Sequence, residues 1–351
     1  MEHSVTRRRA IGITAASAGL SLVPLGCPAR AEANLVTWRG HAMGALASVQ
    51  IHHKDRIAAE RLVRRAVTEV RRLERILSLY REDSTLVALN RSGVLPAPPP
   101  ELVALLDECR RYWELTGGSF DPTVQALWIL YWEHFSRPRH DPAGPSADAL
   151  RTALDRVGFR HVVFDRNRIT LGRAGMGLTL NGIAQGYATD RVVSLLRAEG
   201  IERSLVDMGE SRAVGARDEG VPWRIGLADP DAPERVSETL ELVDNAVATS
   251  GAYGFRFDPE GRCNHLLDPK SGRSAGLYKS VTVIASTATA ADGLSTAFSF
   301  LPLTEIELAL RTVRDGQVRL TTAVGERIVL TAPGLEPAHC CSLLNVQGRT
   351  R

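Results

Sequence analysis

Residues 179–190 read TLNGIAQGYATD, and this stretch organises the rest of the sequence around it. Gly182 and Gly186 bracket a short apolar step, after which a helical pattern starts at once. The spacing matches neither the dinucleotide fingerprint G-x-G-x-x-G nor the P-loop G-x-x-x-x-G-K-[ST]. Even so, glycines let backbone approach a ligand closely, and a helix N-terminus attracts phosphate. Taken alone, the stretch is more simply interpreted as a tight strand-to-helix connection.

A second stretch, residues 290–301, reads AADGLSTAFSFL. Asp292 and Thr296 are four residues apart, so on a helix they share one face. A carboxylate and a hydroxyl one turn apart are oxygen ligands suited to Mg²⁺, with substrate phosphates completing the coordination shell. On spacing alone, a helix cap at Asp292 and a surface Thr296 remain the simpler interpretation.

A third stretch, residues 247–272, reads VATSGAYGFRFDPEGRCNHLLDPKSG. Thr249, Ser250 and Gly251 stand at the end of an expected strand. His265 precedes an Asp-Pro turn by three residues, and a histidine in such a loop is a candidate general base near neutral pH. A lone histidine is more often structural.

The surrounding pattern predicts helices first and strands later. A strand region covers residues 35–52 with a break at Met43–Gly44, and amphipathic helices are expected over about 57–77, 101–118 and 147–159. Beyond residue 160 short strand-like runs dominate, among them GFRFD and CNHLLD, interrupted by helices at about 182–200 and 290–301. This order favours an α+β fold over alternating β/α units.

The first 33 residues have the three parts of a secretory signal peptide. Arg7–Arg9 form a basic start, an apolar run follows, and Ala31–Ala33 supply the cleavage pattern. Thr6-Arg7-Arg8 indicates the twin-arginine type, and the alternative is a membrane anchor. Cys27 faintly resembles a lipoprotein site, but Pro24 stands where leucine is expected, so we expect no lipid anchor. The sequence thus predicts a periplasmic protein with one domain over residues 34–351.

Charge and cysteine content restrict the partners and the covalent framework. The formal net charge is +3, and the excess lies mostly in the signal peptide. No later run of Lys or Arg is dense enough to indicate a nucleic-acid partner. Export permits disulfides, and Cys109, Cys263, Cys340 and Cys341 allow three complete pairings, among which the sequence does not choose. We interpret these cysteines as structural or incidental.

Taken together and in order, these stretches resemble the ApbE family, the FAD:protein FMN transferases. The matching segments are Met43-Gly44, SLY through LN at Asn90, GGSFDPTV, NGIAQGYATDRV, VDMGES, WRIGLADP, VATSG, NHLLDP with KSG, and ADGLSTA. The resemblance spans about residues 35–300. It implies an α+β fold with mixed or antiparallel sheets, flanking helices and an active site between the two halves.

The resemblance also implies a reaction. Family members use FAD as substrate with Mg²⁺, split its pyrophosphate, and transfer FMN to a Thr or Ser hydroxyl of a partner flavoprotein, releasing AMP. Carried onto this chain, the metal would be held by the backbone oxygen of Ala184 and by the side chains of Asp292 and Thr296. His265 is implied as a base or orienting group near the acceptor hydroxyl.

The same resemblance implies a set of FAD-binding residues. They are Met43, Gly44, Tyr80, Asn90, Asp121, Gly182, Ile183, Gln185, Gly186, Thr249, Ser250, Gly251 and His265. VDMGES with NGIAQGY also resembles the NosX subgroup, which implies a NosR-like acceptor and transient contact with a membrane protein. Gln185 stands where the family commonly has Lys, and the loss of this positive charge near the phosphates would be expected to weaken FAD binding or slow turnover. Ala252 replaces a polar residue.

Other activities fit parts of the same pattern. Water in place of the acceptor hydroxyl would make the protein an FAD pyrophosphatase that yields FMN and AMP. The losses at Gln185 and Ala252 slightly favour a flavin-binding protein without catalysis. A redox enzyme of the dinucleotide-binding class is not expected, because its glycine fingerprint and alternating βαβ pattern are absent.

Overall fold

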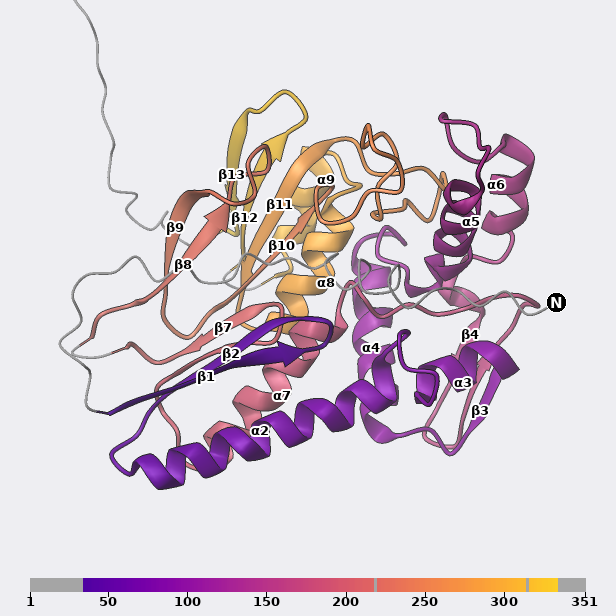
Figure 1. Cartoon of the computed structure of the whole chain (residues 1–351). Coiled ribbons are helices and arrows are strands. Elements are labelled where there is room, and N and C mark those ends of the chain that lie inside the picture. Colours follow the sequence, from indigo (N-terminus) through magenta and orange to yellow (C-terminus); the bar gives the residue numbers. More distant parts are fainter. Residues whose placement is uncertain (1–33, 218–219, 314–315, 334–351) are drawn as a thin grey trace, which may run out of the picture.

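The computed structural model describes residues 34–217, 220–313 and 316–333 (Figure 1). The expected signal peptide, Cys340 and Cys341 lie outside the described residues. The helices are α2 (Arg56–Leu77), α3 (Thr85–Ser92), α4 (Pro100–Leu115), α5 (Gln125–Ser136), α6 (Ala147–Leu154), α7 (Ala184–Ala198), α8 (Ala288–Phe298) and α9 (Leu303–Leu310), with 3-10 turns at Pro122–Val124 and Phe159–His161. The strands are β1 (Leu35–Ala42), β2 (Ala45–His52), β3 (Val94–Pro96), β4 (Val162–Phe164), β5 (Arg168–Leu171), β6 (Ser204–Asp207), β7 (Ser211–Val214), β8 (Trp223–Ala228), β9 (Val236–Leu242), β10 (Ala246–Gly251), β11 (Tyr278–Ala285), β12 (Gln317–Thr322) and β13 (Arg327–Thr331).

An eight-stranded antiparallel sheet is the centre of the fold. Its strand order is β1-β2-β6-β7-β10-β11-β12-β13, and each neighbouring pair runs antiparallel. Smaller sheets are formed by β3-β5-β4 and by β8-β9. Helices and antiparallel sheets in this arrangement confirm the predicted α+β class.

The first hairpin shows how the sequence dictates a local turn. Ala42 pairs with Ala45, so Met43 and Gly44 alone connect β1 to β2. Their φ angles are 51° and 80°, the left-handed values that a two-residue type I′ turn requires at both positions. The predicted break at Met43–Gly44 is therefore this turn.

Side chains on the sheet alternate between two cores, because successive residues of a strand point to opposite faces. Val206 and Ala248 pack in the main core with α2, α7 and α8, which cover one face of the sheet in Figure 1. Their chain neighbours Leu205 and Val247 instead pack with Trp223 of β8 in a second, smaller core. The sheet is thus buried on both faces, which gives α7 and α8 a rigid support.

The part of the molecule around α5 and α6 differs from the sequence-based expectation. GFRFD and CNHLLD were expected as strands, but they form a loop held by two isolated bridges, Arg256 with Asn264 and Leu267 with Ser274. The helices α5 and α9 were not predicted. In α5 the run QALWILYWEHFS carries apolar and aromatic residues on most sides, so it lacks a one-sided pattern.

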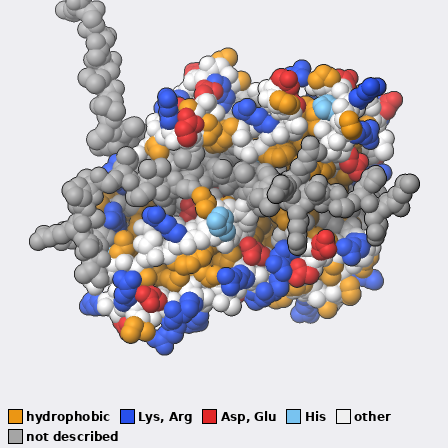
Figure 2. All heavy atoms as spheres, in the orientation of Figure 1, with side chains coloured by type: hydrophobic (Ala, Val, Ile, Leu, Met, Phe, Trp, Pro, Cys, Tyr) orange, Lys and Arg blue, Asp and Glu red, His pale blue; other side chains and the backbone are white. Residues whose placement is uncertain are grey.

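Two cysteines, the helices and the surface charges bear on what the sequence led us to expect. Among the described residues, Cys109 and Cys263 are both free and buried. Within the same residues no helix has the length and apolarity needed to cross a bilayer. Figure 2 shows basic and acidic side chains interspersed, with Lys and Arg gathered along the lower margin over α2, where Arg56 pairs with Glu60 and Arg72 with Glu69.

Candidate active site

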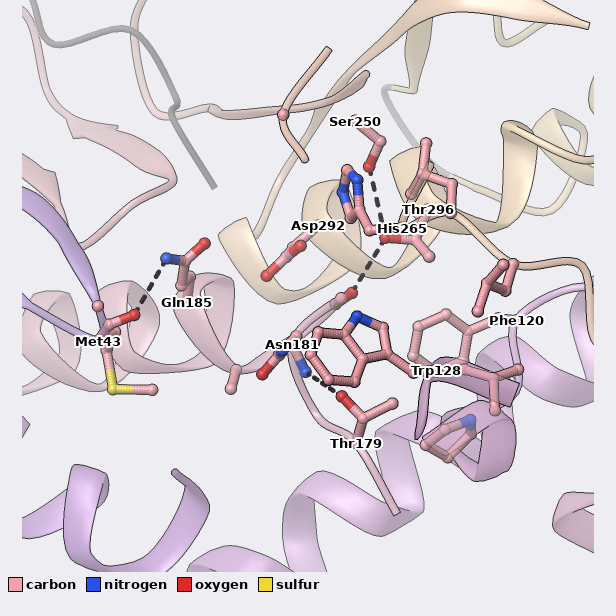
Figure 3. A pocket seen from close by; sticks show the side chains of 18 of the residues that line it. Met43, Phe120, Trp128, Thr179, Asn181, Gln185, Ser250, His265, Asp292 and Thr296 are labelled. Carbon is pink, nitrogen blue, oxygen red and sulfur yellow. Dashed lines mark hydrogen bonds between the residues drawn. The ribbon is translucent and has the colours of Figure 1, made fainter. Parts of the chain in front are cut away.

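A cavity of about 350 Å³ lies where the two halves of the chain meet. It is bordered by the β1–β2 turn, the segment after α2, the start of α7, the end of β10, the loop before β11 and one face of α8. Its walls are formed by most of the site residues expected from sequence: Met43, Gly44, Tyr80, Asp121, Gly182, Ala184, Gln185, Thr249, Ser250, Gly251, His265, Asp292 and Thr296. Segments far apart in sequence are therefore brought to one cavity (Figure 3).

The glycines of the opening stretch allow two helices to approach each other. A Cβ on Gly186 would fall inside contact distance of the Ala288 carbonyl oxygen, and one on Gly182 would lie 2.8 Å from Thr296 Oγ1. The Gly186 N–H donates to Asp292 Oδ2 at 2.9 Å. Gly182 lines the cavity, whereas Gly186 and the fully buried Ile183 lie behind it. The glycines thus hold the start of α7 against α8.

Asp292 presents a buried carboxylate to this cavity. Asp292 is 4% exposed. Burial raises the pKa of its carboxyl to about 7; the Gly186 hydrogen bond opposes this shift and the nearby charge of Asp190 adds to it. Oδ2 is bonded to Gly186, and Oδ1 forms no hydrogen bond with any residue that the structure describes. Figure 3 shows the carboxylate directed into the cavity. A buried carboxylate oxygen without a partner is suited to bind a cation.

The donors around Asp292 fit a hard metal ion better than a soft one. Thr296 lies one turn further along α8, and its hydroxyl is 3.5 Å from the Gly182 carbonyl oxygen and 3.4 Å from Ser250 Oγ. In the described part of the chain, no three His, Cys, Asp or Glu side chains converge on one point. A site of one carboxylate, a hydroxyl and backbone oxygen of Ala184 suits Mg²⁺, which takes oxygen ligands and shares its shell with substrate phosphates.

His265 stands in the cavity wall beside Ser250 and Thr296 (Figure 3). Its Nδ1 lies 3.1 Å from the Phe255 carbonyl oxygen. Since a carbonyl only accepts, Nδ1 carries the proton, and in the neutral ring Nε2 is then the acceptor. Burial lowers the pKa of His265 although the Phe255 hydrogen bond opposes this. The ring is therefore neutral at pH 7 and able to accept a proton.

Gln185 ties the start of α7 to the β1–β2 turn. Its Nε2 donates to the Met43 carbonyl oxygen at 3.2 Å, and the Met43 N–H donates to Glu74 Oε1 at 2.8 Å. Gly209, with φ of 112°, leaves room for the amide, because a Cβ there would lie 2.5 Å from Gln185 Cδ. The residue thus fixes one wall of the cavity without adding a charge to it.

Three other expected site residues have structural partners. Asn90 lies outside the cavity wall and exchanges two hydrogen bonds with the Leu178 backbone, at 2.8 and 2.7 Å. Asp121 lines the cavity, but its carboxylate accepts from the Thr123 and Phe159 backbones. The Tyr80 hydroxyl accepts from Asn181 Nδ2 at 2.9 Å. Asn90 thus supports the wall from outside, whereas Asp121 and Tyr80 are held in the wall by their own hydrogen bonds.

Sequence reasoning missed several wall residues, notably Glu210 and Trp128. Glu210 follows β6 in VDMGES and is 8% exposed; burial, Asp292 and Asp207 raise its pKa well above the usual range. Trp128 lies in the helix α5 that was not predicted. Of the Lys and Arg side chains that the structure describes, Arg81 alone lines the cavity. An anionic substrate would therefore meet mostly acidic groups there, and a bound cation would offset the repulsion.

The chain is similar to known proteins both in sequence and in fold. A sequence model of the ApbE family matches residues 43–319. The chain is 34% identical over 296 residues to an FAD:protein FMN transferase of Treponema pallidum, covering 77% of this chain and 80% of that protein. A Vibrio cholerae protein of the same name is 32% identical over 285 residues, covering 78% and 83%. The solved flavin transferase ApbE from Vibrio cholerae superposes with a TM-score of 0.72 at 27% identity, covering 85% of this chain and 97% of that one. The chain belongs to the ApbE family.

Proposed function

We propose that this protein transfers FMN from FAD to a Thr or Ser hydroxyl of a partner flavoprotein and releases AMP. It is a flavin transferase, as curated relatives with this fold are named. The observation that carries the proposal is the Asp292 oxygen that has no hydrogen-bond partner among the described residues, beside the same cavity that Ala184 and Thr296 line. That oxygen set can fix a diphosphate through a cation.

Magnesium is the ion that we propose for this oxygen set. The Asp292 carboxylate, the Thr296 hydroxyl and the Ala184 backbone oxygen would hold it, while the diphosphate of FAD completes its shell. A bound Mg²⁺ would offset charge on the diphosphate and on the departing phosphate of AMP. The few charged groups of the chain itself agree with a reaction that needs mainly positioning and electrostatic stabilisation.

The chain's own residues then position the reacting atoms. The acceptor hydroxyl oxygen forms a bond to the phosphorus of the FMN half, the bond from that phosphorus to the bridging oxygen breaks, and AMP leaves with the oxygen. The hydroxyl proton passes to Nε2 of His265, whose Nδ1–H bond to Phe255 holds the ring in the accepting tautomer. The Ser250 and Thr296 hydroxyl oxygens lie 3.4 Å apart, near the ring in Figure 3, and would mark where the acceptor hydroxyl enters.

The direct test incubates the protein from residue 34 onward with FAD, Mg²⁺ and a candidate acceptor domain, and measures the acceptor mass. An FMN adduct that depends on the metal supports the proposal. Release of FMN and AMP without acceptor would instead indicate the pyrophosphatase. Retention of intact FAD with neither product, for every acceptor and metal tried, would indicate a flavin-binding protein without catalysis.

We also propose that the protein acts in the periplasm on a membrane-bound or periplasmic flavoprotein. The basic, apolar and cleavage parts of residues 1–33 support export by the twin-arginine route. The likeness of VDMGES and NGIAQGY to the NosX subgroup supports a NosR-like acceptor. Fusing residues 1–33 to a reporter that the twin-arginine route alone exports tests the first point. A reporter that stays in the cytoplasm would contradict it.

A further inference from the structure

Aromatic side chains form one wall of the cavity and the layer behind it. Trp128 of α5 lines the cavity, and Trp132, Phe255 and Phe257 surround it on the side away from the cavity. Phe120, Val124 and Pro269 line the same end of the cavity. This end is apolar, in contrast to the carboxylates beside α8.

The indole ring of Trp128 has one face covered by protein. It stacks on Trp132 with ring centroids 5.5 Å apart and ring planes 9° apart. Phe257 meets the indole edge-on, with ring centroids 5.8 Å apart and an interplanar angle of 63°. Trp128 is nevertheless half-buried and borders the cavity. In Figure 3 the ring stands between Asn181 and Phe120. The face opposite Trp132 is therefore the one available to a ligand.

A ring held in this way is suited to bind another planar ring. Aromatic rings attract one another in offset stacks, and a ring whose orientation is already fixed loses little freedom on binding. FAD has two planar ring systems, adenine and isoalloxazine, joined through the diphosphate. With the diphosphate beside Asp292 and Thr296, one of the two rings can extend toward Trp128.

We propose that Trp128 is a specificity-determining residue that stacks on a planar ring of FAD, and that Trp132, Phe255 and Phe257 hold its indole ready. This inference rests on the proposed use of FAD as substrate. Adenine and isoalloxazine are both planar aromatic rings, so either could stack on Trp128. Two ligands that each carry only one of these rings show which one does.

The aromatic layer also supports His265, so the control variant must disturb this support to the same extent as the Trp128 variant does. The ring centroid of Phe255 lies 6.3 Å from the ring centroids of both Trp128 and Trp132. The Phe255 carbonyl oxygen accepts the Nδ1 hydrogen of His265. A change at either tryptophan therefore disturbs Phe255 and the histidine similarly. Only a change at Trp128 removes the ring that faces the cavity, so Trp132→Leu is the matched control for Trp128→Leu.

The test measures FAD affinity by titration calorimetry with Mg²⁺ present, for wild type, Trp128→Leu, Trp128→Phe and Trp132→Leu. We expect Trp128→Leu to weaken FAD binding about tenfold, the size of one lost aromatic stack. Trp128→Phe retains most of the affinity. Trp132→Leu leaves the cavity-facing ring in place but less firmly held, so its loss of affinity is clearly smaller than that of Trp128→Leu. Near-ultraviolet circular dichroism and thermal melting establish that each variant is folded, and Trp128→Phe keeps the test valid if Trp128→Leu does not fold.

FMN and ADP as separate ligands identify the ring. The proposal expects Trp128→Leu to weaken one of them and leave the other near the wild-type value. Unchanged FAD affinity in Trp128→Leu, or an equal loss in Trp132→Leu, would overturn it. A wild-type protein that binds no FAD at all would contradict the proposed function instead, so the two failures are distinguishable.

Discussion

Asp292 uses its two carboxylate oxygens differently. Oδ2 accepts the Gly186 N–H and so joins α8 to α7, whereas Oδ1 faces the cavity. Burial keeps the carboxyl partly protonated near neutral pH, with a pKa raised to about 7. A cation that binds Oδ1 must therefore compete with a proton, and the same residue links packing to catalysis.

Replacing Asp292 separates these two uses. Asp292→Asn keeps an oxygen for Gly186 but loses the anionic ligand, so we expect metal-dependent turnover to fall by at least about a hundredfold while the protein stays folded. In wild type, apparent Mg²⁺ affinity should rise as pH increases from about 6 to 8, because the carboxyl loses its proton. Turnover assays check the effect of Asp292→Asn, and magnesium titrations at several pH values check the pH dependence of the affinity. Unreduced activity in Asp292→Asn would refute the metal assignment.

Gln185 offers a second test at this scale. It is 5% exposed and lies in a wall with Glu210 and Asp292 but without a lysine. Gln185→Lys should keep a donor for the Met43 carbonyl oxygen and place a positive charge near the bound diphosphate, lowering the Kd for FAD several-fold at low ionic strength. The neutral Gln185→Met is the shape control. If Gln185→Lys binds FAD no more tightly than Gln185→Met, the diphosphate lies elsewhere.

At the scale of elements, the pairing of α7 with α8 builds the site. Asp190 of α7 accepts the backbone N–H groups of Ala288 at 3.0 Å and Thr289 at 2.8 Å, and so caps the start of α8. Gly186, one turn earlier in α7, lets the helices touch. The residues that we propose as metal ligands on both helices thereby keep a fixed separation.

Gly186→Ala should break this pairing. The added methyl group would meet the Ala288 carbonyl oxygen, a backbone atom that cannot move aside cheaply. We expect a loss of about 1–3 kcal/mol in the free energy of unfolding and a larger loss of Mg²⁺ affinity. Gly276→Ala, where a Cβ has nothing within 4 Å, is the control and should leave both unchanged. Denaturant unfolding measures this, and equal stability of the two variants would contradict the account.

Local patterns were sufficient to predict some elements and insufficient for others. The three-four spacing of α2 and the Met43–Gly44 break are confirmed, because each depends on residues close in sequence. Helix α5 was missed because its aromatic residues are buried by the 253–275 loop, a long-range contact. For the same reason the sequence did not indicate that Trp128 lines the cavity. It also did not predict that the Asn90 amide binds the Leu178 backbone.

At the scale of the whole molecule, several separate elements place acidic groups in the interior near the cavity. Asp121, Asp207, Glu210 and Asp292 all have pKa values raised chiefly by burial. Burying these ionisable carboxyl groups favours the binding of a cation but does not stabilise the folded chain. Stability and function are therefore opposed in this region, as the pH dependence of folding should reveal.

Without metal, the protein should become less stable as pH rises through the range where Asp292 loses its proton in the folded state. The unfolded chain releases this proton near pH 3.8 and the folded protein near about 7. The folded state thus holds more protons in between, and the free energy of unfolding falls across that window. Melting temperatures with and without Mg²⁺ from pH 5 to 8 check this. Asp292→Asn should flatten the slope, and an equally steep slope in that variant would contradict the assignment.

A crystal structure of the protein with FAD and Mg²⁺ tests the central claim most directly. The account predicts a metal ion about 2.1 Å from Asp292 Oδ1, near Thr296 and the Ala184 carbonyl oxygen, with the FAD diphosphate on its open side. FAD bound outside this cavity, or a metal ion that does not touch Asp292, would contradict it.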